Sequence, residues 1–213
     1  NREYVTWTGS LLGEKVSVIS TGIGCPSAAI AVEEAIEAGA DTLIRVGSSG
    51  SMQPHIHTGD VVVVSAAIRD EGTTPYYLPI EFPAVADIEV VNALREAAER
   101  LGYKSHTGIA QSKDSFYGEV ERARMPMPAR LAERWNAFIT GGAACSEMES
   151  SALFILSSIY RKRAGGVMLV INESDLAEVD EDNPAKHMAE FDADRVIKVA
   201  VEALKILIQS DRH

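Results

Sequence analysis

Two carboxylates and a thioether stand together at residues 147–149, directly before a segment that is predicted to be an apolar helix. The run 150–160 has apolar residues at helical spacing and contains neither Gly nor Pro. Backbone N–H groups at the start of a helix stabilise carboxylates, so Glu147 and Glu149 could be caps beside Met148 as core filler. A carboxylate at the edge of a core can instead accept hydrogen bonds from two adjacent sugar hydroxyls. The segment alone favours the caps.

The second candidate for chemistry is Arg45, which lies in the apolar run 42–46, a predicted strand. Burying an unpaired guanidinium costs several kcal/mol, so Arg45 requires an anion. That anion is either an internal glutamate or a phosphate, which a Gly-Ser-Ser-Gly turn at 47–50 would also bind through hydroxyls and backbone N–H groups. Such a turn at the carboxyl end of a strand sits where open α/β sheets bind ligands. The residues leave both alternatives open.

Two further motifs have a structural and a functional interpretation. Phe116 and Tyr117 follow the predicted strand 105–111 and could stack on a planar base, although periodicity favours the core. The turn at 21–27 contains two glycines but lacks the third glycine of a dinucleotide-binding fingerprint. This turn therefore favours simple close packing of a strand against a helix.

The elements that must position these residues alternate between strands and helices. Asp87 is the predicted N-cap of a helix over 88–101. The charged segment 119–128 is predicted to be a flexible loop. Predicted strands are 15–20, 42–46, 61–65, 105–111, 137–140 and 166–172, and the other predicted helices are 28–38, 129–135, 150–160 and 191–208. This alternation predicts an α/β fold with a mostly parallel or mixed sheet and helices on both sides.

Composition limits the function classes. The 213 residues are 46% hydrophobic and 24% charged, which is ordinary for a globular protein, and we expect a single domain over 1–213. A net charge of −11 argues against nucleic acid or an anionic membrane as the main partner, so local arginines would have to bind an anionic substrate. Two cysteines are too few for a disulfide framework and fit a reducing compartment.

The chain shows no targeting segment. No apolar run approaches the roughly 20 residues of a membrane span, and no secretory signal is visible. The chain begins at Asn1 without a methionine, so we expect that an N-terminal segment is missing. Together with the cysteine content, these features favour a cytoplasmic protein.

Several motifs follow one another in a specific order and spacing. They are NREY (1–4), STGIGCPS (20–27), IRVGSSG (44–50), QPHI (53–56), EFPAVAD (81–87), DSFY (114–117) and SEMES (146–150). With these motifs the chain resembles the nucleoside phosphorylase family, and within it the bacterial uridine phosphorylases, along nearly its whole length from Arg2. The resemblance implies a single-domain, three-layer α/β/α fold with a mixed central sheet.

The resemblance also implies a role for each candidate residue. The phosphate ligands would be Arg45, Gly47, Ser48 and, contributed by a neighbouring subunit, Arg2. The ribose would be bound by Ser48, Met148 and Glu149, and the base by Phe116, Arg122 and Glu147. The catalytic residues would be Arg45, Glu149 and Arg122. Some members hold a potassium ion between subunits at the positions of Glu3, Ile23 and Ser27.

The implied activity is reversible phosphorolysis of uridine to uracil and ribose 1-phosphate. Inorganic phosphate would be the co-substrate, and no cofactor would be required apart from potassium in some members. The family forms homo-oligomers built from dimers, commonly hexamers. Because Arg2 would serve the neighbouring subunit, an isolated monomer should be inactive.

The sequence departs from the family pattern at three places, which keeps other functions open. Val120 stands where a base-binding glutamine is common, Glu173 stands where some members have an arginine, and an upstream phosphate loop and histidine are absent. One alternative is a purine nucleoside phosphorylase that uses Asp175 as an acid. A nucleosidase that uses water is a second alternative, although Arg45 would then lack an anion. A non-catalytic nucleoside-binding homologue is the third.

Overall fold

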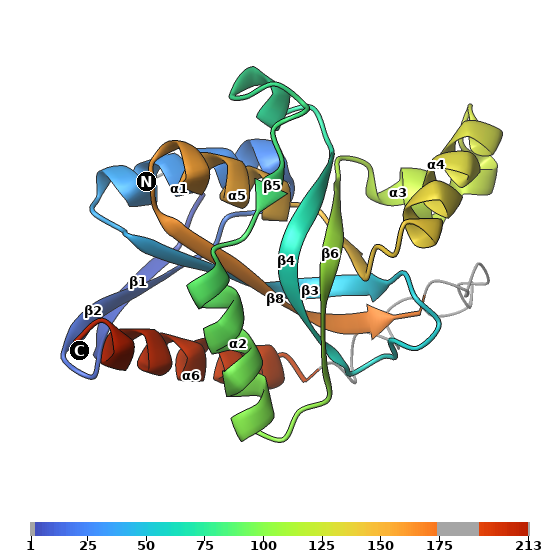
Figure 1. Ribbon diagram of the computed structural model, residues 1–213. Coiled ribbons are helices and arrows are strands. Elements are labelled where there is room, and N and C mark those ends of the chain that lie inside the picture. Colours follow the sequence, from blue (N-terminus) through green and yellow to red (C-terminus); the bar gives the residue numbers. More distant parts are fainter. Residues whose placement is uncertain (1–2, 174–191, 213) are drawn as a thin grey trace.

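A mixed β-sheet lies between two pairs of helices in the computed structural model, which describes residues 3–173 and 192–212 (Figure 1). Helices α1 (Cys25–Glu37) and α5 (Ser150–Ile159) cover one face, and α2 (Ile88–Arg100) and α6 (Asp194–Ser210) cover the other. The strand order is β5 (Ala84–Val85), β4 (Val61–Asp70), β6 (Ser105–Lys113), β7 (Cys145–Glu147), β3 (Thr42–Ser51) and β8 (Arg163–Asn172). The predicted three-layer α/β/α fold with a mixed central sheet is confirmed.

An additional pairing closes this sheet on itself. Strand β3 is parallel to β8, and β6 is parallel to both β4 and β7. Strand β7 is antiparallel to β3, and β8 is antiparallel to β4, so the pairings form a ring. Gly166 of β8 faces both β3 and β4, and a Cβ at this position would lie 3.2 Å from Met168 Cε and 3.4 Å from Val64 Cβ. A glycine here therefore lets the strands approach closely.

The core follows the predicted apolar runs. The first four residues of β4, Val61 to Val64, have no exposed surface, which confirms the predicted buried central strand. Asp87 caps α2 as predicted, because its carboxylate accepts hydrogen bonds from the backbone of Glu89 and Val90. The predicted helix after Glu149 is also confirmed as α5, which is buried from Ser150 to Ser157.

Three predicted elements are wrong. The Gly-Ser-Ser-Gly segment 47–50 is not a turn but the second half of β3, because its pairing with β8 continues to Gly50 and Asn172. Arg45 therefore lies in the middle of a strand and not at its carboxyl end. The predicted strand 137–140 is the last turn of α4 (Pro128–Thr140). The predicted loop 119–128 instead contains the end of α3 (Phe116–Val120) and a 3₁₀-helix, η2 (Arg122–Arg124).

The remaining elements lie outside the central sheet. Strands β1 (Thr6–Leu11) and β2 (Glu14–Ile19) form a separate antiparallel hairpin beside α6 (Figure 1). A short 3₁₀-helix, η1 (Thr74–Tyr76), lies in the segment between β4 and β5. Within the described ranges, no helix has the length and hydropathy that crossing a membrane requires.

Candidate functional site

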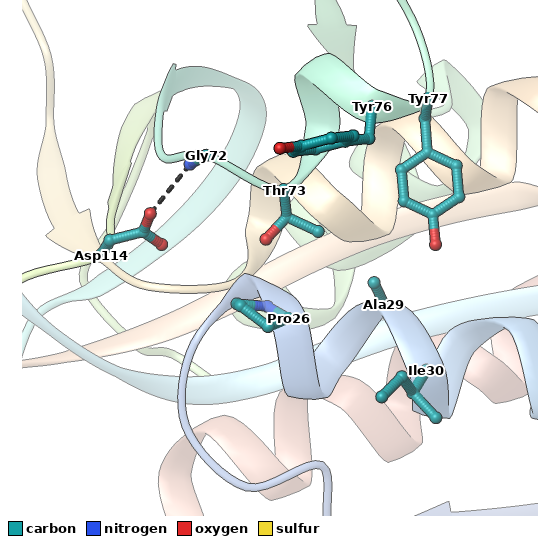
Figure 2. Close-up of a pocket in the computed structure, with 8 residues that line it drawn as sticks. All are labelled: Pro26, Ala29, Ile30, Gly72, Thr73, Tyr76, Tyr77 and Asp114. Carbon is teal, nitrogen blue, oxygen red and sulfur yellow. Dashed lines mark hydrogen bonds between the residues drawn. The ribbon is translucent and has the colours of Figure 1, made fainter.

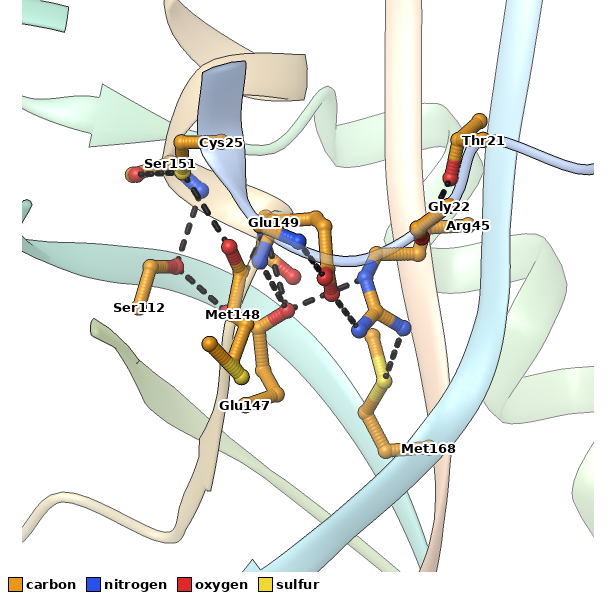
Figure 3. Close-up of polar contacts among 12 residues, drawn as sticks. Thr21, Gly22, Cys25, Arg45, Ser112, Glu147, Met148, Glu149, Ser151 and Met168 are labelled. Carbon is orange, nitrogen blue, oxygen red and sulfur yellow. Dashed lines mark hydrogen bonds and ion pairs between the residues drawn. The ribbon is translucent and has the colours of Figure 1, made fainter. Parts of the chain in front are cut away.

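The guanidinium of Arg45 contacts both of the carboxylates that follow β7 (Figure 3). Its Nε lies 3.0 Å from Glu147 Oε2, and its Nη2 pairs with Glu149 Oε2. Its Nη1 lies 3.1 Å from the sulfur of Met168. Because β7 is antiparallel to β3, the chain after Glu147 runs back along β3 toward Arg45. Of the two anions considered for Arg45, the structure supplies the internal glutamates.

The side chain of Glu147 caps the start of α5 from two residues before its N-cap residue, Glu149. Its side chain has no exposed surface and accepts hydrogen bonds from the backbone N–H groups of Glu149 at 2.9 Å and Ser150 at 3.0 Å. The hydroxyl of Ser112 also donates to it. These donors, the positive end of the helix and Arg45 together compensate the buried charge. The cap interpretation therefore holds for Glu147, and its contact with a base stays a prediction.

Glu149 does not cap its own helix. Its second oxygen, Oε1, accepts a hydrogen bond of 2.5 Å from the backbone N–H of Gly24, the N-cap residue of α1. Its side chain is 10% exposed, in contrast to the fully buried side chain of Glu147. Glu149 therefore lies where the core meets solvent, as a carboxylate that binds hydroxyl groups must.

The glycine turn before α1 does more than pack a strand on a helix. Gly22 and Gly24 have φ values of 67° and 91°, which favour glycine, and a Cβ at Gly22 would lie 2.9 Å from Ser27 Oγ. This conformation exposes the Gly24 N–H to Glu149. The sequence interpretation of simple packing is thus incomplete, because the turn binds an anion of the protein itself.

A second contact ties this turn to the residue between the two glutamates. The thiol of Cys25 donates to the backbone oxygen of Met148 at 3.2 Å. Burial raises the pKa of Cys25 to about 12, so the sulfur keeps its proton and remains a donor at neutral pH. Met148 is half-buried at the same edge of the core as Glu149.

The charges of this cluster compensate one another only in part. Burial opposes the positive charge of Arg45, but the carboxylates of Glu147 and Glu149 outweigh burial and hold the pKa of the guanidinium above its usual value. One arginine between two carboxylates leaves a net charge of −1 in this group. In this structure Glu149 occupies Nη2 and Glu147 occupies Nε, and the binding of phosphate by Arg45 stays a prediction.

Gly47 makes room for Arg45. A Cβ at Gly47 would fall on the guanidinium and lie 2.9 Å from Arg45 Cζ. Ser48 is exposed on the same strand. Both residues lie within three positions of Arg45, and their roles as phosphate and ribose ligands stay predictions.

Phe116 and Arg122, the base-binding residues predicted in segment 116–122, contact groups other than Arg45. Phe116, the first residue of α3, is 52% exposed, so it is not the core residue that periodicity favoured. Arg122 stacks on the ring of Trp135, with its Cζ 4.9 Å from the ring centroid. Among the described residues, no hydrogen bond or ion pair joins Phe116 or Arg122 to Arg45, and the contact of these two residues with a base stays a prediction.

A buried polar cluster that the sequence reading missed supports α3. Lys113, the last residue of β6, lies 2.5 Å from Glu119 Oε1 and 2.7 Å from Ser146 Oγ. Ser112 was missed as well, although it binds Glu147. Like Arg45, Lys113 is a cation within a strand, which is an unusual place for a charge. The predicted strand ended at residue 111, whereas β6 continues to Lys113, so this signal was missed.

The predicted potassium ligands lie at the surface near the start of α1. Glu3 is exposed, Ile23 is 79% exposed, and the backbone oxygen of Ser27 accepts a hydrogen bond of 2.7 Å from Tyr4. Their carboxylate, hydroxyl and carbonyl oxygens are the donor atoms that hard cations prefer, so the donor set fits such an ion. Arg2 and Asp175 lie outside the described residues.

The sequence of the chain matches a known protein family over almost its whole length. A family model described as the phosphorylase superfamily matches residues 1–210. The chain belongs to the phosphorylase superfamily. The resemblance to nucleoside phosphorylases is therefore confirmed over nearly the whole chain.

Three relatives of this phosphorylase superfamily member show which activities occur among similar proteins. A uridine phosphorylase of Treponema pallidum is 50% identical over 99% of this chain and 80% of its own length. A uridine phosphorylase of Escherichia coli is 39% identical over 98% of this chain and 82% of its own length. A guanosine phosphorylase of Halorubrum lacusprofundi is 34% identical over 97% of this chain and 83% of its own length.

Proposed function

We propose that this protein is a pentosyltransferase that catalyses the reversible phosphorolysis of uridine to uracil and ribose 1-phosphate. The observation that carries the proposal is the pairing of Arg45 with Glu149 at the edge of the core. In this pairing a cation that could bind phosphate lies beside a carboxylate whose oxygens could accept hydrogen bonds from ribose hydroxyls. Relatives named uridine phosphorylase at 39% and 50% identity support this substrate.

The reaction requires positioning and charge stabilisation more than covalent catalysis. A phosphate oxygen bonds to the anomeric carbon while the glycosidic bond breaks, and the bonding electron pair leaves with N1 of uracil. Hydrogen phosphate supplies the proton that N1 finally carries, so uridine and HPO₄²⁻ give uracil and the ribose 1-phosphate dianion. Positive charge develops on the sugar and negative charge on the base. Preorganised charges around both groups lower the barrier.

Each residue of the site has a proposed task in this reaction. Arg45 and Ser48 bind phosphate, and Gly47 keeps the space that the guanidinium of Arg45 occupies. Glu149 accepts hydrogen bonds from the ribose hydroxyls, with Met148 packed against the sugar. Phe116 stacks on uracil, and Arg122 donates to the base as negative charge develops. Arg2 of a neighbouring subunit completes the phosphate site.

The surface near α1 supports assembly with a second copy of the chain (Figure 2). Tyr76 and Tyr77 of the segment after β4 face Pro26, Ala29 and Ile30 of α1 across a surface pocket. Tyr76 is 92% exposed, and exposed apolar side chains that gather in one region mark interaction surfaces. We propose that the protein is a homo-oligomer built from dimers, a hexamer, in the cytoplasm.

The proposed assembly includes a potassium ion between subunits. Its ligands would come from Glu3, Ile23 and Ser27 of adjoining chains, and the ion would supply only charge compensation at the interface. Phosphate is the co-substrate, and no redox or organic cofactor is part of the proposal.

A purine nucleoside is the second candidate substrate. The relative named guanosine phosphorylase favours it, as does Asp175, which could protonate a purine base. Val120 lacks the hydrogen-bonding group of the glutamine that is common in uridine-specific members. The proposed phosphate and ribose residues would serve either nucleoside. The residues of segment 116–122, which are proposed to contact the base, would therefore decide between uridine and a purine nucleoside.

Measuring the cleavage of uridine, inosine and guanosine, each with and without phosphate, tests the proposal. We expect cleavage that requires phosphate and a kcat/KM that is highest for uridine. Preference for inosine or guanosine would support the purine alternative. Cleavage that is undiminished without phosphate would indicate a nucleosidase, and cleavage of none of the three would indicate a non-catalytic homologue.

A further inference from the structure

Lys113 and Glu119 form an ion pair that is almost completely removed from water. Lys113 Nζ lies 2.5 Å from Glu119 Oε1, and the two side chains are only 10% and 12% exposed. Burying two charges is costly unless further hydrogen bonds satisfy them. Ser146 provides such bonds, because its hydroxyl lies 2.7 Å from Lys113 Nζ and 3.0 Å from Glu119 Oε2. The pair is therefore a built polar cluster and not a chance surface contact.

The cluster extends across the sheet to α4. Ser146 Oγ is also 3.0 Å from Gln111 Oε1, and Gln111 Nε2 donates to Asp70 Oδ2 at 2.7 Å. Asp70 in turn pairs with Arg134 of α4. The network thus connects α3, through β7, β6 and β4, to the helix that carries Trp135 under Arg122.

Strands β6 and β7 carry the Lys113 cluster on one face and residues that contact the Arg45 cluster on the other face. Side chains alternate between the faces of a strand, and Ser112 is paired with Glu147 while Gln111 is paired with Ser146. Ser112 therefore reaches the carboxylate beside Arg45, whereas its neighbour Lys113 reaches α3. The phosphate and ribose residues and the α3 network are fixed to the same short stretch of backbone.

The network acts on the segment that is proposed to bind the base. Glu119 lies in α3 between Phe116 and Arg122, the two proposed base contacts. Lys113 Nζ is 5.9 Å from the centroid of the Phe116 ring, which is a favourable position for a cation beside an aromatic face. The side chain of Val120 has no group that could hydrogen-bond to the base or to the sheet. The contacts of Lys113 with Glu119 and Phe116 are therefore major restraints on this segment.

We propose that Lys113 and Glu119 are positioning residues for the base: their ion pair holds segment 116–122 against β6 and β7 and thereby sets the affinity and specificity for the base. This inference rests on the proposed function. It predicts that loss of the pair weakens the binding of nucleoside and leaves phosphate binding intact, because Arg45 lies on the other face of the strands.

The test compares Lys113→Met, Glu119→Gln and Lys113→Arg with the wild-type enzyme. We expect KM for uridine to rise about tenfold in the first two variants, since misplaced contacts cost about that much or more. KM for phosphate should stay within about twofold, and Lys113→Arg should recover most of the affinity because it keeps the charge. The ratio of uridine to inosine cleavage should fall in Lys113→Met and Glu119→Gln.

Lys104→Met is the matched control. This variant also removes a lysine that pairs with a carboxylate, since Lys104 Nζ lies 2.8 Å from Asp60 Oδ2. Lys104 precedes the first residue of β6, whereas Lys113 is its last residue. Lys104→Met should leave both KM values unchanged. An unchanged KM for uridine in Lys113→Met and Glu119→Gln would overturn the inference, and so would equal rises in KM for uridine and for phosphate.

Hydrogen exchange separates this inference from the proposed function. If the wild-type enzyme cleaves no uridine in the presence of phosphate, the proposed function fails, and the amides of 116–124 then provide the readout. These amides should exchange faster in Lys113→Met than in wild type, while those of α5 keep their protection. Unchanged exchange at 116–124 would overturn the positioning role. If Lys113→Met does not fold, Glu119→Gln takes its place in both measurements.

Discussion

Glu147 and Glu149 lie two positions apart and share Arg45, but they contact different groups. The carboxylate of Glu147 is fully buried and accepts hydrogen bonds from the start of α5 and from Ser112. The carboxylate of Glu149 lies at the edge of the core and accepts one bond from Gly24. A buried carboxylate with several donors stabilises the fold, whereas a carboxylate at the edge is available to a ligand. The two residues should therefore respond differently to substitution.

Replacing Glu149 should remove activity and retain the fold. Hydrogen bonds to a charged group are worth about 1.5–3 kcal/mol each, so the loss of even one bond to ribose reduces kcat/KM by roughly 10–200-fold. Glu149→Ala should therefore lose most uridine phosphorolysis and keep a native circular dichroism spectrum. Unchanged turnover would remove Glu149 from the site.

Replacing Glu147 should instead lower stability. Glu147→Gln weakens the cap of α5 and leaves the Nε of half-buried Arg45 without its carboxylate, so we expect a loss of about 1–3 kcal/mol in the free energy of unfolding. Urea titration measures this loss. Glu96→Gln is the control, since Glu96 pairs with Arg100 at the surface and should contribute less than about 0.5 kcal/mol. Equal losses in both variants would contradict the assignment.

At the scale of elements, the sequence identified those segments whose local pattern agrees with their surroundings. The predicted helix cap at Asp87, the buried run of β4 and the start of α5 are all found where they were expected. Each has a local cause, because a cap, a run of valines and an uninterrupted helical pattern act within a few residues.

The elements that sequence reasoning missed depend on pairing between distant strands. Residues 47–50 have the composition of a turn, but pairing with β8 and β7 keeps them in β3. The ring of strands and the direction of β7 cannot be read from periodicity, and they bring Glu149 to Arg45. The sequence could therefore identify Arg45, Glu147 and Glu149 as candidate site residues by their types. It could not decide whether Arg45 pairs with internal glutamates or with a phosphate, because that depends on how distant strands pair.

The cap of α2 gives a test at this scale. Asp87→Ala removes the hydrogen bonds to the backbone of Glu89 and Val90, which should cost about 1 kcal/mol of stability without loss of activity. Thermal unfolding and uridine turnover measure the two effects. The control is Asp41→Ala, since Asp41 is exposed and its side chain makes no hydrogen bond or ion pair with the described residues. A loss of activity in Asp87→Ala at unchanged stability would contradict this account.

At the scale of the whole molecule, the proposed site needs two subunits. Each site would combine Arg45 of its own chain with Arg2 of the neighbour. Arg2→Ala and Arg45→Ala should therefore each be inactive, and a mixed dimer should contain one intact site. Random mixing makes half of all dimers mixed, so about one quarter of wild-type activity should return. If the mixture stays inactive although mixed dimers form, Arg2 does not act across the interface.

The most direct test of the central claim follows the phosphate itself. Phosphorus NMR of the wild-type enzyme with uridine and inorganic phosphate should show ribose 1-phosphate forming in equal amount to the uracil released, and the reaction should run backwards when uracil and ribose 1-phosphate are supplied. Release of uracil with free ribose, at a rate that does not depend on phosphate, would contradict the account.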